Sequence, residues 1–151
     1  MTRQSGLGVR EASASYEAQA AKAGGLLIDT HAALWWFIDD PRLPKTAREA
    51  IADPAVPVFF STASAWELAI KASIGKLPEM PDVPGRLPGF VSGSGFRLLP
   101  IQLDHAMRAG DLPQHHRDPF DRLLVAQADI ENLTVVTRDP MFPKYGCKTL
   151  W

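Results

Sequence analysis

The chain has 151 residues, 46% of them hydrophobic, which is enough apolar material for one domain with a single core. The formal net charge of -1 excludes a whole-molecule attraction to nucleic acid or to an anionic membrane, so such binding would need a local patch. The single cysteine, Cys147, excludes an intramolecular disulfide framework and a Cys-rich zinc site. The apolar runs are too short to span a bilayer, and no apolar core of a secretory signal is found, so we expect a cytoplasmic protein.

The first 25 residues differ in composition from the rest of the chain. They are rich in Ala, Ser, Gly and Gln, and their few large apolar residues are scattered. We therefore expect residues 1–25 to form a flexible leader, with a short helix possible at 11–23, and residues 26–151 to form the folded domain.

The rest of the chain alternates between short apolar runs and longer segments with helical periodicity. Strands are predicted at residues 26–28, 56–60, 96–101, 133–136 and 148–150. Helices are predicted at residues 31–38, 44–52, 61–73 and 104–109, and from Pro119 onward. The Pro- and Gly-rich segment 78–95 leaves room for at most one short helix, near residues 86–91. This alternation favours an α/β domain with a parallel sheet and helices on both faces.

Four carboxylates occur where predicted strands end or the next helices begin, namely Asp29, Glu67, Asp121 and Asp139. The functional crevice of a parallel sheet lies at the carboxyl ends of its strands, so we expect these four acids to meet there. Two carboxylates about 4 Å apart repel by roughly 4 kcal/mol at an effective dielectric near 20. A divalent cation, or protonation, is then needed to keep them together.

Oxygen ligands favour a hard cation, Mg²⁺ or Mn²⁺, over zinc. Because Mg²⁺ usually binds only one or two carboxylates directly, we expect some of the acids to act through water. One such water would attack a phosphodiester in line, with Glu67 or Asp121 as its general base.

Each acid also has a purely structural explanation. Glu67 could complete a capping box with Ser64 or pair with Lys71. Asp29, Asp121 and Asp139 could be ordinary helix caps, first-turn acids or turn formers. Four such residues at one predicted edge are much harder to explain by accident than any one of them.

The segment before the long helix adds basic side chains to the candidate site. Asp118 is expected to cap this helix, with Pro119 in its first turn. Adjacent loop histidines such as His115 and His116 are more typical of solvated residues than of a catalytic base. Three arginines are predicted to contact phosphate: Arg117, Arg122 and Arg138.

Four segments stand out in their order along the chain: Leu27–Ala32, Ser64–Lys71, His116–Leu124 and Val136–Asp139. Together they resemble the PIN-domain family, and more narrowly the VapC-type toxins of bacterial toxin–antitoxin pairs. The resemblance implies a PIN-like three-layer nuclease domain over residues 26–151, with a central parallel sheet of four to five strands. It implies an endoribonuclease that depends on Mg²⁺, for which Mn²⁺ can substitute.

The resemblance also assigns roles to residues and implies partners. The catalytic acids are Asp29, Glu67, Asp121 and Asp139, and the expected metal ligands are Asp29, Asp118, Asp121 and Asp139. Thr30 and Thr137 are expected to support the acids. The implied partners are an RNA substrate, a second copy of the chain in a homodimer, and a cognate antitoxin that blocks the metal site, often with a basic side chain.

Two non-catalytic alternatives stay open. A receiver-like signalling domain also combines a parallel sheet with clustered acids. It needs two adjacent acids after the first strand, however, and a lysine directly after one of the last strands. Here Thr30 follows Asp29, and Arg138-Asp139 stands where the lysine would be. The other alternative is a PIN-like partner-binding module whose nuclease site has lapsed.

Overall fold

The structure, a computed structural model, describes residues 25–151. The predicted leader therefore lies outside the described residues, apart from Gly25. Five strands form one sheet: β1 (Leu26–Ile28), β2 (Val58–Ser61), β3 (Arg97–Leu99), β4 (Thr134–Val136) and β5 (Thr149–Leu150). All strand pairs are parallel, and the order across the sheet is β3-β2-β1-β4-β5.

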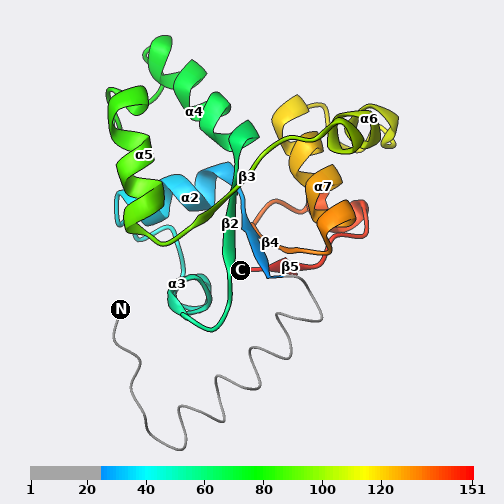
Figure 1. Cartoon of the computed structure of the whole chain (residues 1–151), viewed down its shortest axis with the longest axis horizontal. Helices are drawn as coiled ribbons and strands as arrows, with labels where there is room; N and C mark the ends of the chain where they lie inside the picture. Colours follow the sequence, from blue (N-terminus) through cyan, green and yellow to red (C-terminus); the bar gives the residue numbers. More distant parts are fainter. Residues whose placement is uncertain (1–24) are drawn as a thin grey trace, which may run out of the picture.

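Seven helices connect these strands in the described part of the chain: α2 (Thr30–Phe37), α3 (Lys45–Ala52), α4 (Thr62–Ser73), α5 (Val83–Gly93), α6 (Leu103–Asp111), α7 (Pro119–Glu131) and α8 (Met141–Lys144). In Figure 1, α2, α3 and α5 lie on one side of the sheet, and α6 and α7 lie on the other. The predicted three-layer α/β fold is thus confirmed. Among residues 25–151, no helix has the length and apolar character that a membrane span requires.

The alternating side chains of β1 separate two apolar cores. Leu26 and Ile28 pack into the larger core, which α2, α3 and α5 complete. Leu27, between them, packs into the smaller core with residues of α7 and α8. Because successive residues of a strand point to opposite faces, a run of three buried apolar residues requires helices on both faces of the sheet.

The strand order excludes the receiver-like alternative. Receiver-type doubly wound sheets have the strand order 2-1-3-4-5, whereas here β1 lies between β2 and β4. The central position of β1 places the residue that follows it, Asp29, beside the end of β4.

The prediction for segment 78–95 was wrong in extent. Helix α5 has 11 residues, although it contains Pro88, and a proline inside a helix costs about 3 kcal/mol. The N-cap Asp82 accepts a hydrogen bond from Gly85 N, and the early Pro84 needs no backbone donor. The helix also buries one apolar residue per turn against the larger core: Val83, Leu87 and Val91. This burial offsets the cost of Pro88. It is hard to recognise in the sequence because the prolines and glycines of the segment indicate that a helix ends there.

Candidate metal centre and active site

The candidate site lies at the carboxyl edge of the sheet, where β1 and β4 end side by side. Ile28 pairs with Val136, so Asp29 and Thr137 leave the sheet at the same level. Asp29 caps α2 through a hydrogen bond of 2.7 Å from Ala32 N to its Oδ1. Its backbone N also donates to Val136 O. The first predicted acid is therefore fixed by the sheet and by a helix start.

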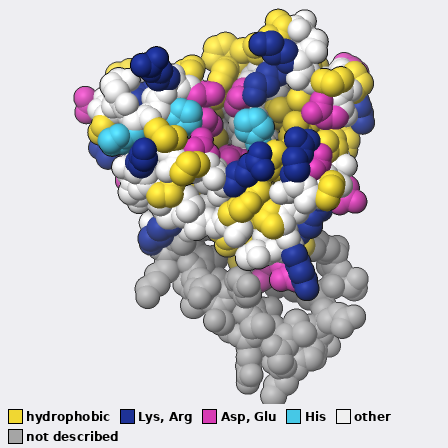
Figure 2. Space-filling view, turned by 180° about the vertical axis from the view of Figure 1, so that it is seen from behind, with side chains coloured by type: hydrophobic (Ala, Val, Ile, Leu, Met, Phe, Trp, Pro, Cys, Tyr) yellow, Lys and Arg dark blue, Asp and Glu magenta, His cyan; other side chains and the backbone are white. Residues whose placement is uncertain are grey.

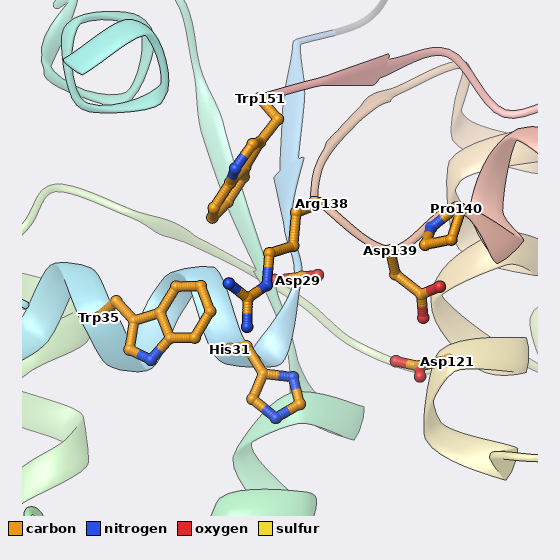
Figure 3. Close-up of a pocket in the computed structure, with 8 residues that line it drawn as sticks. All are labelled: Asp29, His31, Trp35, Asp121, Arg138, Asp139, Pro140 and Trp151. Atoms are coloured by element: carbon orange, nitrogen blue, oxygen red, sulfur yellow. The ribbon is translucent and has the colours of Figure 1, made fainter. Parts of the chain in front are cut away.

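A cavity of about 320 Å³ opens at this edge. It has an acidic part and an aromatic and basic part, and its lining residues are Asp29, His31, Trp35, Asp121, Arg138, Asp139, Pro140 and Trp151. Figure 3 shows the carboxylates of Asp121 and Asp139 close together, with Asp29 on the β1 side. In Figure 2, acidic and histidine side chains gather around a hollow, with Lys and Arg side chains beside it. The structure thus brings three of the four predicted catalytic acids to one cavity.

Glu67, the fourth acid, lies in α4 and is not among the residues that line this cavity; it is buried, with 4% of its surface exposed, and its charge acts on Asp121. Lys71 Nζ lies 2.9 Å from its Oε2, whereas its Oε1 has no hydrogen-bond partner among the described residues. The predicted pairing with Lys71 is therefore present. The alternative capping box with Ser64 is wrong, because Ser61 caps α4. An unpartnered buried carboxylate oxygen is costly and indicates that a cation or a water completes the site.

Burial, and to a smaller extent neighbouring negative charge, raises the pKa values of two of the acids. Burial raises the pKa of Asp121 to about 7, with further increases from Asp118, Glu67 and Asp29, while His116 lowers it. Burial also raises the pKa of Asp29, although Thr137 and Ala32 N donate hydrogen bonds to it. A cluster that favours protonated carboxyls is one that a divalent cation would stabilise by displacing the protons.

The supporting threonines connect the acids to the fold. Thr30 Oγ1 donates to Ser64 Oγ at 2.9 Å, which joins the start of α2 to α4. Thr137 bonds Asp29 and accepts a hydrogen bond from Asp139 N at 3.0 Å. Thr137 therefore holds two of the acids in a fixed relation.

Asp118 caps α7 as expected, since its Oδ1 accepts from Phe120 N at 2.9 Å and from Asp121 N at 3.2 Å. It is not among the residues that line the cavity. Its predicted role as a metal ligand stays a prediction.

The three predicted phosphate-binding arginines differ in their surroundings. Arg122 donates to the carbonyl oxygens of Ala109, Leu112, Pro113 and His116 at 2.8 to 3.3 Å. The predicted phosphate contact does not fit this arrangement, because these donors already hold the loop before α7. Arg117 is exposed. The exposed Arg138 lies over Trp35, with its guanidinium carbon 4.6 Å from the ring centroid.

The interpretation of His116 as a solvated loop residue was wrong. Its Nε2 lies 2.9 Å from Asp121 Oδ2 and 3.1 Å from Asp139 Oδ2, and 18% of its side chain is exposed. The ligand atoms of these three residues lie within 4.8 Å of one another. In the sequence, His116 opens the His116–Leu124 segment and comes two residues before the helix cap Asp118, which places it beside the acidic first turn of α7. His115, by contrast, is exposed and contacts Tyr145.

Comparison with known proteins agrees with this architecture. The PIN domain family model matches residues 26–147, so the chain belongs to the PIN-domain family. The structure of VapBC2 from Rickettsia felis, bound to a DNA fragment from their promoter, contains a similar chain, with TM-score 0.61 and 18% identity over 83% of this chain and 96% of that one. FitAcB from Neisseria gonorrhoeae contains another, with TM-score 0.56 and 21% identity over the same shares of the two chains. At these identities the two structures show a shared fold. No curated protein matches the sequence.

Proposed function

We propose that this chain is a Mg²⁺-dependent endoribonuclease and acts as the VapC-type toxin of a toxin–antitoxin pair. The observation that carries the proposal is the acidic cluster at the carboxyl edge of the sheet, in which Asp29 and Glu67 are buried and one oxygen of Glu67 has no hydrogen-bond partner among residues 25–151. Membership of the PIN-domain family supports a nuclease, because this family generally consists of nucleases.

The donor set fits a hard divalent cation. Asp29, Asp121 and Asp139 offer carboxylate oxygens in one cavity, and Asp118 lies next to them. Mg²⁺ or Mn²⁺ held there would neutralise the cluster, polarise a phosphodiester and lower the pKa of a water. The raised pKa of Asp121 has the direction expected for a ligand that binds a proton when no cation is bound.

The side chains around the acids have separate tasks in this proposal. Glu67 is the better candidate for the general base, because Lys71 holds one of its oxygens and leaves the other able to accept a proton from water. Arg138 is the better placed phosphate contact. Its position over Trp35 limits the freedom of its guanidinium, which can still donate two parallel hydrogen bonds to a phosphate.

The partners follow from the same assignment. The solved structures with this fold include the VapBC2 and FitAcB complexes. We propose that a cognate antitoxin covers the acidic cavity of this chain, that two copies of the chain form a homodimer, and that the protein acts in the cytoplasm.

The test is cleavage of RNA by the purified chain with Mg²⁺, with Mn²⁺ and with a chelator. The substitution Asp29→Asn should abolish cleavage and leave the fold intact, since the amide retains the oxygen that caps α2. Glu49→Gln, which alters an exposed acid of α3, is the control and should cleave as well as the unaltered chain. Undiminished cleavage by Asp29→Asn would refute the site. A well-folded unaltered chain that binds neither metal and cleaves no RNA would favour the lapsed, partner-binding alternative.

A further inference from the structure

The loop of residues 112–117 inserts His116 between two of the candidate metal ligands. Nε2 of His116 faces Asp121 Oδ2 and Asp139 Oδ2 at 2.9 and 3.1 Å. The two carboxylates come from different elements, since Asp121 lies in the first turn of α7 and Asp139 follows β4. One imidazole thus connects two parts of the site that are 18 positions apart in the chain.

Contacts with the rest of the fold set the position of this loop. Tyr145 Oη accepts a hydrogen bond from His116 N at 2.7 Å and donates one to Pro113 O at 2.8 Å. Arg122 binds four carbonyl oxygens at the end of α6 and in the loop, including those of Pro113 and His116. The backbone of His116 is therefore fixed on both sides, so the fold sets the position from which its ring reaches the two acids.

The other ring nitrogen of His116 determines which nitrogen carries the proton. Nδ1 lies 3.3 Å from Asp118 N and accepts a hydrogen bond from this backbone N–H group. A backbone N–H can only donate, so Nδ1 must offer its lone pair, and the ring proton is then on Nε2. An Nε2–H group donates to carboxylates, but it has no lone pair for a metal ion. Histidines that bind a metal through Nε2 have the opposite arrangement, in which Nδ1–H donates to an acceptor.

We infer that His116 is a positioning residue whose Nε2–H holds the carboxylates of Asp121 and Asp139 together, and that it is not a ligand of the metal. The inference rests on the proposed function only where it concerns the metal. Asp139 Oδ1 accepts from Met141 N at 2.9 Å, so both oxygens of Asp139 are oriented by donors. Asp121 is oriented through Oδ2, which leaves its Oδ1 as the oxygen to bind a cation.

The first experiment determines the ring proton without any metal. In ¹⁵N-labelled metal-free protein, the nitrogen shifts of His116 should be those of the Nε2–H form, with the signals assigned by their loss in His116→Gln. The proton on Nε2 should also remain when Mg²⁺ is added to the unaltered chain. An Nδ1–H form, or loss of the Nε2 proton on adding Mg²⁺, would overturn the inference, and both are read from the unaltered chain.

The second experiment compares metal affinities by calorimetry. His116→Ala should weaken binding of Mg²⁺, Mn²⁺ and Co²⁺ by similar factors of about 10 to 100, as expected when an outer hydrogen bond to the ligands is lost. His116→Gln should recover part of the loss, because its amide can donate to the same oxygens. His115→Ala, the neighbouring control, should bind all three metals normally.

The alternative, a ligating imidazole, gives a different result. Imidazole is a better ligand for Co²⁺ than for Mg²⁺, so loss of a ligand would weaken Co²⁺ binding far more and change the ratio of the two affinities. That change would overturn the inference and leave the proposed nuclease site standing. If the unaltered chain binds none of the three metals, the proposed function fails, while the Nε2–H assignment is decided by the first experiment alone.

Discussion

His105 and His116 have the same local hydrogen-bond pattern, but their surroundings differ. In each, Nδ1 accepts a backbone N–H, from Gln102 N for His105 and from Asp118 N for His116, and Nε2 faces carboxylate. His105 is fully buried and bonds Glu131 Oε1 at 2.8 Å, which joins α6 to the end of α7. His116 faces two carboxylates, both of which line the cavity.

A histidine–carboxylate pair is therefore not by itself a sign of a functional site. His105 Nε2 has Glu131 at hydrogen-bond distance and Asp104 Oδ1 at 4.0 Å. Both carboxylates are exposed to solvent, and the His105–Glu131 pair has a structural role. Around His116, three acids line one cavity. Burial raises the pKa of Asp121 there, and the negative charges of Asp118, Glu67 and Asp29 raise it further. The excess of negative charge, more than the histidine, distinguishes the candidate metal site from the His105 pair.

The largest expected difference between the two regions concerns the carboxylates that the histidines face. Asp121→Asn should lower Mg²⁺-dependent RNA cleavage at least about 100-fold, because loss of a direct ligand should exceed the 10- to 100-fold effect of an outer contact. Glu131→Gln, the matched change beside His105, should leave the rate per folded molecule unchanged. Steady-state cleavage of a labelled RNA measures both, and equal losses would remove the distinction between the regions.

For stability we expect the reverse order: replacing His105 should destabilise the folded chain more than replacing His116. His105→Ala removes a fully buried ring and leaves the backbone donor of Gln102 without its partner, so the free energy of unfolding should fall by about 2–4 kcal/mol. His116→Ala, at a partly exposed position, should cost less stability while weakening metal binding. Urea unfolding monitored by tryptophan fluorescence gives both values. A larger stability loss for His116→Ala would reverse the assignment.

Metal binding should stabilise the folded chain through the His116 region alone. Mn²⁺ at 100 times its dissociation constant should add about 2.7 kcal/mol to the free energy of unfolding, if it does not bind the unfolded chain. The melting temperature should therefore rise with Mn²⁺ in the unaltered chain and in Glu131→Gln, and much less in Asp121→Asn. An unchanged melting temperature in the unaltered chain at millimolar Mn²⁺ would count against the metal centre.

A smaller effect is expected from pH in the metal-free protein. The pKa of Asp121 is raised to about 7 in the folded chain, so the folded state keeps this proton where the unfolded chain has lost it. The stability due to this proton is complete below the unfolded pKa near 4 and is lost as the pH rises toward 7. Melting temperatures measured with a chelator from pH 5 to 8 should fall more steeply for the unaltered chain than for Asp121→Asn. Equal slopes would show that Asp121 does not carry the shift.

Much of the candidate site could be predicted because it depends on local features. The short apolar run Leu26–Ile28 predicts a buried strand, and in a parallel sheet the residue after it, Asp29, must lie at the carboxyl edge. Asp118 and Pro119 mark the start of α7 and so place Asp121 in its first turn. These positions follow from periodicity and capping, which act over a few residues.

The remaining features depend on contacts between distant residues. Arg122 and Arg138 are equivalent as sequence signals, but Arg122 packs against loop carbonyls, whereas Arg138 lies over Trp35 in the cavity. Helix α5 forms despite Pro88 because its apolar residues reach a core supplied by other elements. A proline or an arginine has the same local chemistry in either setting, so only the packing around it selects its role.

Local patterns are enough to predict the α/β architecture and to place the acids at one edge of the sheet, because hydrophobic periodicity and helix caps act over a few residues. Only the folded chain shows that His116 lies between Asp121 and Asp139. That contact requires the loop before α7, which Arg122 and Tyr145 hold in place, to meet the turn after β4. Side chains this far apart in the chain meet only when the packing of whole elements fixes their distance.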